Sequence, residues 1–276
     1  MQLVAYGAQD IYLTGNPQIT FFKVVYRRHT NFAMESIEQT FNGTADFGRK
    51  VTCTVSRNGD LVHRMWLQTT LPELAAPTGD ATQKKVGQGW VDRVGHALIS
   101  NVEVEIGGQR VDKQYGDWMN VWSELSLPSG QKNGYDEMVG NVSATQPVGV
   151  ASGTALKKDA YTLYVPLQFW FCRNPGLALP LIALQYHEVK VNLEFRALSQ
   201  LGLKAADNAS DWAPDTGLSG SLSGTSLWVD YIYLDTDERR RFAQVSHEYL
   251  IEQVQFTGAE SVTAGDNKVR LNFNHP

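Results

Sequence analysis

The sequence is poor in cysteine, in net charge and in long hydrophobic runs. Its two cysteines, Cys53 and Cys172, lie far apart and outside any CxxC pair, so neither a disulfide scaffold nor a zinc framework is predicted. A net charge of -5 in 276 residues argues against sequence-specific nucleic-acid binding, which requires a basic face. No stretch approaches the ~18 apolar residues of a membrane span. Residues 1–10 lack a basic start and a long apolar core, so we expect synthesis in the cytoplasm.

Sequence patterns of catalytic and metal sites are also missing. There is no Walker loop, GxSxG elbow, HExxH motif or EF-hand loop. His187 and Glu188 are neighbours in an alternating segment, so their side chains point to opposite sides of a strand. Glu103 and Glu105 share one face, which we interpret as a solvated polar face. We therefore expect no metal, no cofactor and no enzymatic activity. The six histidines are scattered along the chain, at His29, His63, His96, His187, His247 and His275.

What the sequence does contain is the alternation of β-strands. Strands are predicted at 50–56, 61–71, 97–112, 160–171, 181–197 and 227–235. Asn58-Gly59 predicts a hairpin between the first two of these, and Gly107-Gly108 predicts a tight turn within the third. About eight strands before residue 236, joined by unequal connections, favour an all-β fold of the jelly-roll type over an up-and-down barrel.

Short helices and long loops complete this prediction. Apolar residues recur at i, i+3, i+4 and i+7 over 115–126, which predicts an amphipathic helix that helps to close the sandwich. A second helix is predicted over 236–244, capped by Thr236, with Asp237 and Glu238 at the positive end of its dipole. Long loops are predicted at 128–155 and 199–226. Most of the seven tryptophans are expected in the core. The apolar positions of the first helix are Trp118, Val121, Trp122 and Leu125.

Two further strand-like segments, 249–260 and 267–276, exceed what one sandwich needs. Two strands do not form a stable unit of their own. Either the chain therefore ends inside an unfinished second domain, or these last strands pack on the first one.

The opening stretch "LTGNPQITFFKVVYRRHTNFAMES" (13–36) resembles the N-terminal hallmark of a known family. The family comprises the major capsid proteins of nucleo-cytoplasmic large DNA viruses, which include phycodnaviruses, mimivirus relatives and iridoviruses. Blocks at 59–72, 90–125, 167–195 and 229–255 resemble the same family, in the same order. The sequence is thereby identified as the N-terminal portion of a member.

The resemblance implies a double jelly roll, of which this sequence holds one eight-stranded roll and the opening strands of the second. It places an N-terminal segment at 1–24, the first jelly roll at 25–235, a linking helix at 236–246 and the truncated second roll at 247–276. It implies a homotrimer of pseudo-hexameric outline that contacts neighbouring capsomers and minor capsid proteins in the virion. These trimers would tile an icosahedral shell around an internal viral membrane.

The resemblance also gives the opening stretch a role. It implies that the N-terminal segment lies toward the virion interior, where its cationic residues meet acidic partners, either minor capsid proteins or anionic lipid heads. The alternative is that Arg27 and Arg28 solvate a strand end and pair with Glu35 and Glu38. The proposed contact residues are Lys23, Arg27, Arg28 and His29.

Two other functions stay open on the residues alone. A lectin-like jelly roll could stack sugars on loop aromatics such as Trp212 and Tyr135. A glycosidase would need two facing carboxylates, and the sequence offers no convincing pair. Three sequons, at Asn42, Asn141 and Asn208, are interpreted as loop markers and weak candidates for glycan attachment.

Overall fold

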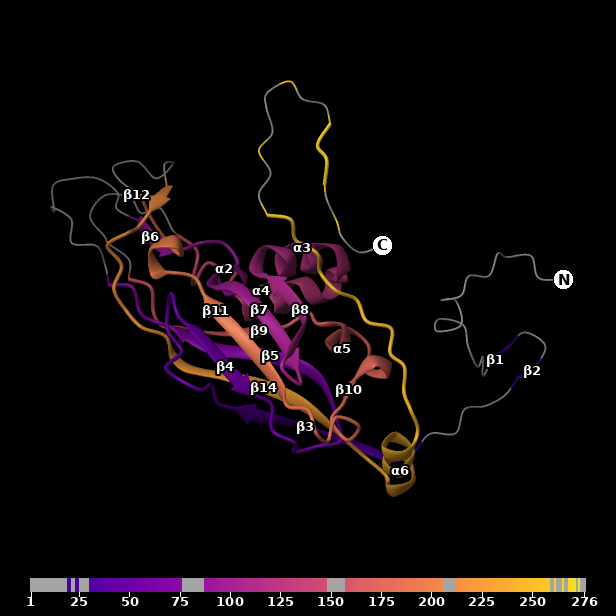
Figure 1. Ribbon diagram of the computed structural model, residues 1–276. Coiled ribbons are helices and arrows are strands. Elements are labelled where there is room, and N and C mark those ends of the chain that lie inside the picture. The colour runs from indigo at the N-terminus through magenta and orange to yellow at the C-terminus, as the bar shows by residue number, and fades with distance from the viewer. Residues whose placement is uncertain are drawn as a thin grey trace, which may run out of the picture.

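A computed structural model provides the structure of the chain. It describes residues 19–20, 23–24, 30–75, 87–147, 157–205, 212–258, 261, 265, 268–271 and 273. Near the start, β1 (Ile19–Thr20) and β2 (Lys23–Val24) pair with each other. From residue 30 onward two antiparallel sheets form the body of the molecule (Figure 1).

The first sheet has the strand order β3-β14-β5-β9. Its long central pair is β5 (Leu61–Leu71) and β14 (Ser223–Leu234), with β3 (Phe32–Gln39) and β9 (Tyr161–Pro166) at the edges. A short β10 (Leu179–Pro180) pairs with the first two residues of β5. The 61–71 strand predicted from alternation is confirmed to the residue.

The second sheet has the order β4-β11-β7-β8. It consists of β4 (Lys50–Thr54), β11 (Val189–Phe195), β7 (Ile99–Ile106) and β8 (Gln109–Tyr115). Along the chain the strands pass repeatedly from one sheet to the other. This connectivity, with antiparallel pairing throughout, is that of an eight-stranded jelly roll, so the predicted fold class is confirmed.

Side chains from both sheets meet in one apolar core. On β11 every second residue is buried, in the alternation expected for a strand with one face inside. Buried residues of β5 and β14 face them across the sandwich. The core therefore lies between the sheets, as in other double-sheet β folds.

One predicted hairpin is confirmed and the other is wrong. Gly107 and Gly108 have φ of 60° and 85° and join β7 to β8, as a tight hairpin turn requires. Asn58-Gly59, by contrast, connects β4 to β5, which belong to different sheets. A Cβ on Gly59 would lie 2.8 Å from the Cβ of Tyr231. This glycine therefore allows β14 to approach closely at the point where the chain passes from one sheet to the other.

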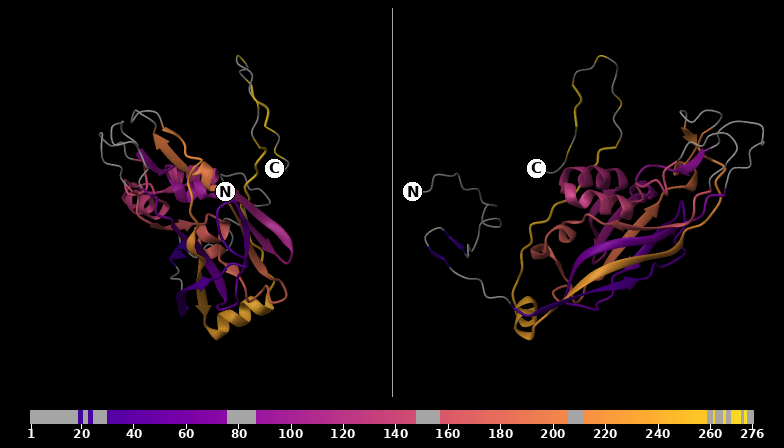
Figure 2. Two further views of the ribbon diagram at one scale, coloured as in Figure 1. Left: turned by 90° about the vertical axis from the view of Figure 1, so that its left-hand side faces the viewer. Right: turned by 180° about the vertical axis from the view of Figure 1, so that it is seen from behind.

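The two predicted long loops contain regular structure, so that prediction was wrong for their described parts. After α3 (Gly116–Ser126), the chain forms η1 (Ser129–Gln131) and α4 (Lys132–Val139). The second region contains η3 (Leu198–Gln200), β12 (Gly202–Ala205) and β13 (Trp212–Pro214). With β6 (Gly87–Trp90), the last two form a third, three-stranded sheet. Figures 1 and 2 show this sheet and α6 (Thr236–Gln244) at opposite ends of the long strands.

Two strands are also shorter than predicted. The segment 160–171 ends as a strand at Pro166 and continues into α5 (Trp170–Arg173), followed by η2 (Pro175–Leu177). The segment 181–197 becomes a strand only at Val189. The residues between these strands turn at the end of the sandwich, and of them only β10 joins a sheet in the described part of the chain.

Helix α3 buries the opposite face from the one predicted. Met119 and Ser123 are buried, whereas Val121 and Leu125 are 48% and 78% exposed. The reason is Gly116, where a Cβ would lie 2.1 Å from the carbonyl oxygen of His96. Glycine thus brings this side of the helix against α2 (Val94–Leu98). The predicted apolar face is only partly covered, because Trp118 and Trp122 are half-buried and Val121 and Leu125 are exposed. These four residues are here called the outward stripe.

The prediction that most tryptophans lie in the core is confirmed for only two of the seven. Trp90 and Trp170 are buried in the core cluster. The remaining five are half-buried, which leaves part of each ring accessible: Trp66, Trp118, Trp122, Trp212 and Trp228.

The chain leaves the sandwich through α6, and residues 245–258 then run without regular structure. Asp235, not Thr236, is the N-cap of α6, because its carboxylate accepts from the Thr236 amide at 2.7 Å. Arg240 pairs with Asp237, and Arg239 with Asp60 of the sandwich. Residues 245–256, here called the strap, follow. The strands predicted at 249–260 and 267–276 are not formed in the parts of those segments that the structure describes.

Candidate assembly surfaces

The predicted cationic contact falls mostly outside the described residues. Lys23 belongs to β2, where it pairs with Thr20. Arg27, Arg28 and His29 lie outside. Of their alternative partners, the Glu35 carboxylate accepts from the Tyr233 hydroxyl at 3.3 Å. The assignment of these residues to an acidic partner stays a prediction.

The asparagines of the three sequons differ in the hydrogen bonds that they make. Asn42 is exposed, and its backbone amide donates to the Thr52 carbonyl oxygen at 2.7 Å. The side-chain nitrogen of Asn141, which a glycan would modify, donates to Asp136 at 3.0 Å. The oxygen of the same amide accepts from Gln146 at 2.8 Å. Asn208 lies outside the described residues, and glycan attachment stays a prediction for all three.

Sites for metal chemistry were not expected. Across the described ranges, no group of three or more His, Cys, Asp or Glu side chains could hold a metal ion. No helix in the same ranges is long and apolar enough to cross a membrane. Both cysteines are buried, and burial raises the pKa of Cys53 to about 11 and of Cys172 to about 12. They are therefore inert thiols at neutral pH.

Glu103 corrects the prediction of a solvated acidic face. It is buried in the middle of β7, with three cations around its carboxylate. Lys113 lies at 2.9 Å, Arg110 at 3.5 Å and Lys50 at 3.8 Å. Burial alone would raise the pKa of Glu103, but the hydrogen bond and charge of Lys113, with the two other cations, hold it below its ordinary value. The long side chains of Lys50 on β4 and of Arg110 and Lys113 on β8 cover this carboxylate.

A buried polar pair under the helices was not predicted from the sequence. His96 of α2 lies 2.8 Å from the Tyr135 hydroxyl of α4 through Nε2, while Nδ1 has no partner among the described residues. Burial, with the nearby Arg93 charge, lowers the pKa of His96 to about 4. Burial raises the pKa of Tyr135 to about 12. Since Tyr135 is buried, it offers no ring for stacking on a sugar, which removes one of the two aromatics of the lectin-like alternative.

Arg93 ties the same helices together. It is the one non-glycine residue with positive φ in the described part of the chain, at 49°. Its guanidinium donates to Asn120 and pairs with Glu124, both on α3, and lies 3.8 Å from Asp136 on α4. The strained backbone is therefore compensated by bonds to two helices.

The strap is held to the sandwich by side-chain contacts. Glu252 pairs with Arg173 of α5, whose guanidinium lies 3.9 Å from the centre of the Trp122 ring. The Val254 amide donates to buried Asp112 at 3.1 Å, and the Phe256 ring packs against the Tyr115 ring at a tilt of 43°, with ring centroids 4.5 Å apart. Figure 1 shows the strap, in yellow, passing α5 and β8 toward α3.

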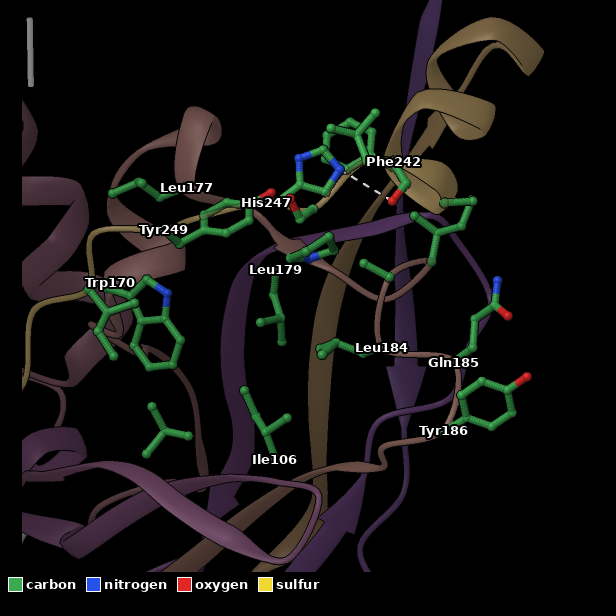
Figure 3. A pocket seen from close by; sticks show the side chains of 18 residues that line it. Ile106, Trp170, Leu177, Leu179, Leu184, Gln185, Tyr186, Phe242, His247 and Tyr249 are labelled. Atoms are coloured by element: carbon green, nitrogen blue, oxygen red, sulfur yellow. Dashed lines mark hydrogen bonds between the residues drawn. The ribbon is translucent and has the colours of Figure 1, made fainter. Parts of the chain in front are cut away.

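An apolar groove of about 630 Å³ opens between the strap and the end of the sandwich. Leu179 and Leu184 come from the sandwich side, and Phe242 and Tyr249 from α6 and the strap (Figure 3). His247 contacts the Phe242 carbonyl oxygen at 3.2 Å, as the dashed line in Figure 3 marks. Such a lining favours packing against another apolar surface over catalysis.

Comparison of the sequence with known proteins identifies a matching family. The sequence profile of the family "Major capsid protein N-terminus" matches residues 20–235. The chain is 59% identical to the major capsid protein of Phaeocystis pouchetii virus and 61% identical to that of Pyramimonas orientalis virus. All of the chain is covered in both comparisons, but it spans only 56% and 62% of the length of these relatives.

Solved structures give the same result. A chain of the PBCV-1 virus capsid matches with a TM-score of 0.70 and 42% identity, over 93% of this chain and 57% of that one. The Faustovirus major capsid protein matches with a TM-score of 0.58 at 12% identity, over 86% of this chain and 60% of that one, which shows a shared fold.

Proposed function

Because the chain belongs to the family of viral major capsid proteins, we propose that it is the N-terminal portion of a structural protein of an icosahedral virus shell. The observation that carries this proposal is the jelly roll of β3 to β14, which lies within the matched residues 20–235. The protein would act in the virion, by packing and without a cofactor or a catalysed reaction.

The unit of assembly would be a homotrimer with a pseudo-hexameric outline, in contact with neighbouring capsomers. We assign residues 1–24 to an N-terminal segment, 25–235 to the first jelly roll, 236–246 to the linking helix and 247–276 to the start of a second roll. Support comes from the family match, which ends at residue 235, where Asp235 caps α6. Permanent interfaces of this kind are large and apolar at their centre.

The cationic residues Lys23, Arg27, Arg28 and His29 would contact minor capsid proteins or the internal viral membrane. In support, β3 begins opposite Leu234, next to α6, at the end of the sandwich away from β6, β12 and β13 (Figure 2). The N-terminal segment thus enters at one end of the molecule, which would be the inner one. Changing Arg27 and Arg28 together to Glu should leave trimers intact and impair shell formation. Normal shells from this variant would refute the contact.

The central experiment is the native mass of the full-length gene product, measured together with binding to a panel of glycans. We expect a stable trimer without glycan affinity. A monomer that binds sugars would overturn the capsid assignment in favour of a binding module. The Asn133→Asp variant, changed at an exposed position of α4, is a control that should assemble like the parent.

A further inference from the structure

Exposed apolar side chains concentrate in two segments of the chain. In the described ranges, most of the large hydrophobic residues that are exposed belong to α3 or to the chain after residue 244. Isolated exposed hydrophobic residues are normal, but a concentration of them marks an interaction surface. The residues in question are Val121 and Leu125 of α3, Val245, Leu250, Ile251 and Phe256 of the strap, and Val269, Leu271 and Phe273 beyond it.

The outward stripe of α3 is continuous. The rings of Trp118 and Trp122 are half-buried and lie 5.9 Å apart along it, with exposed Val121 and Leu125 beside them. The stripe thus forms one apolar surface along the helix.

The strap carries the chain to this stripe. Gln253 donates to the Val111 carbonyl oxygen, Val254 donates to Asp112, and the Phe256 ring contacts the Tyr115 ring. These contacts advance together along both segments, so the strap runs parallel to β8. Tyr115 is the residue before α3 begins. Whatever follows the strap therefore starts at the first turn of α3.

Apolar residues farther along the chain are suited to this place. Val269, Leu271 and Phe273 are spaced two apart, which puts them on one face of an extended segment, and all three are about half exposed. The chain spans only 56% and 62% of the length of its relatives, and the family model that it matches describes the N-terminus of the major capsid protein. We therefore expect the remaining length of the relatives to follow this part of the chain.

We propose that the outward stripe of α3 is an intramolecular seat for the polypeptide that follows the strap, beginning with residues 268–273. This inference rests on the proposed function through the longer relatives, since it specifies how the two halves of a capsid subunit meet. It requires no trimer. The other occupant that could cover the stripe is a second copy of the chain, and the experiment separates the two.

The test is hydrogen–deuterium exchange over residues 116–126, in the full-length gene product and in the 276-residue chain. We expect exchange on α3 to be slower in the full-length product by about tenfold or more, because a covered helix opens less often. Leu125→Asp should abolish that protection and lower the melting temperature of the full-length product only. Leu125 is 78% exposed in the chain described, so the change should leave its folding intact. Asn133→Asp adds the same charge on neighbouring α4 and should alter neither protein.

Cross-linking then assigns the occupant. Lys132 lies beside α3, 3.2 Å from Glu124, and can be linked to whatever covers the helix. In an equal mixture of isotopically light and heavy protein, a seat within one chain gives cross-links between peptides of the same label. Mixed-label cross-links would identify a second copy and overturn the proposal. Equal exchange rates in the two proteins, or a reading frame that ends at Pro276, would also overturn it.

These outcomes are distinguishable from those of the proposed function. A full-length monomer with protected α3 supports the seat and contradicts the capsid trimer. A trimer in which α3 exchanges as fast as in the 276-residue chain supports the capsid function and contradicts the seat.

Discussion

The sandwich and the strap lie side by side but are held in different ways. In β11, Val191 and Leu193 have no exposed surface, and the strand is paired on both sides. In the strap, Leu250 and Phe256 are 42% and 62% exposed, and attachment depends on a few side-chain contacts to β8 and α5. The sandwich thus has a core of its own, whereas the strap is anchored without being covered. We therefore expect the exposed apolar side chains of the strap to pack against a surface other than that of the sandwich.

The largest difference in unfolding free energy should come from truncating one leucine of the sandwich and one leucine of the strap. Leu193→Ala creates a cavity in a closed core and should cost about 2–5 kcal/mol of unfolding free energy. Leu250→Ala removes an exposed side chain and should cost less than about 0.5 kcal/mol. Urea unfolding of the 276-residue chain, followed by circular dichroism, measures both. Equal losses would contradict the contrast between the two regions.

Acid should weaken the sandwich end under the helices. The pKa of His96 is about 4 in the folded chain against an ordinary 6.5. The unfolded chain therefore binds the proton first, and stability should fall by about 3 kcal/mol as the pH drops from about 6.5 to about 4. His96→Gln should flatten this part of the profile. An unchanged profile in this variant would assign the loss of stability to other groups.

Two glycines in the neighbouring helices should respond in opposite directions. At Gly116 a Cβ would meet the backbone oxygens of His96 and Ile99 at 2.1 and 2.5 Å, so Gly116→Ala should cost about 1–3 kcal/mol. At Gly134 in α4 a Cβ would meet nothing within 4 Å. Gly134→Ala should therefore stabilise by about 0.5–1 kcal/mol. Thermal unfolding compares the two variants, and destabilisation by Gly134→Ala would argue against α4.

The charged face of the second sheet should show a smaller effect. Glu103→Gln leaves three cations without their shared carboxylate and should cost about 1–2 kcal/mol, because the partners remain partly hydrated. Glu105→Gln, two residues along the same strand, should cost much less. High salt should reduce the difference between the two variants. A loss that is independent of salt would mean that packing, not charge, holds Glu103.

Release of the strap should be the smallest effect on global stability. Arg173→Gln removes both the pair with Glu252 and the contact with the Trp122 ring, and should cost less than about 1 kcal/mol. Cleavage of the strap by chymotrypsin should nevertheless become a few-fold faster, because the strap opens locally. Lys157→Gln, which breaks an exposed pair with Asp159, is the matched control. Unchanged cleavage would show that Arg173 does not anchor the strap.

Local sequence patterns predicted the strands but not which strands pair. The alternation over 61–71 and the glycines at 107–108 suffice because both signals act over a few residues. Asn58-Gly59 carries an equally local hairpin signal, yet β5 pairs with β14 from the far end of the chain. Which strands pair therefore depends on contacts between residues far apart in the sequence, and a short stretch of sequence does not reveal them.

The candidate surfaces show the same limit. The apolar stripe of α3 was read as a core face because a periodic pattern does not say which neighbour covers it. The signal for the correct face is the spacing of Gly116, Met119 and Ser123, which lets the helix approach α2 closely. Similarly, β7 alone does not reveal Glu103 as buried, because the covering cations come from β4 and β8. Helix α4 was missed because Gly134 favours a loop locally, while buried Tyr135 and Val139 hold the helix in place.

The most direct test of this account is electron cryomicroscopy of the purified full-length gene product. We predict particles of three subunits, each containing the β3 to β14 sandwich, with the outward stripe of α3 covered by later residues of the same subunit. Single subunits in which the sandwich stands alone and α3 faces solvent would contradict both the capsid function and the seat.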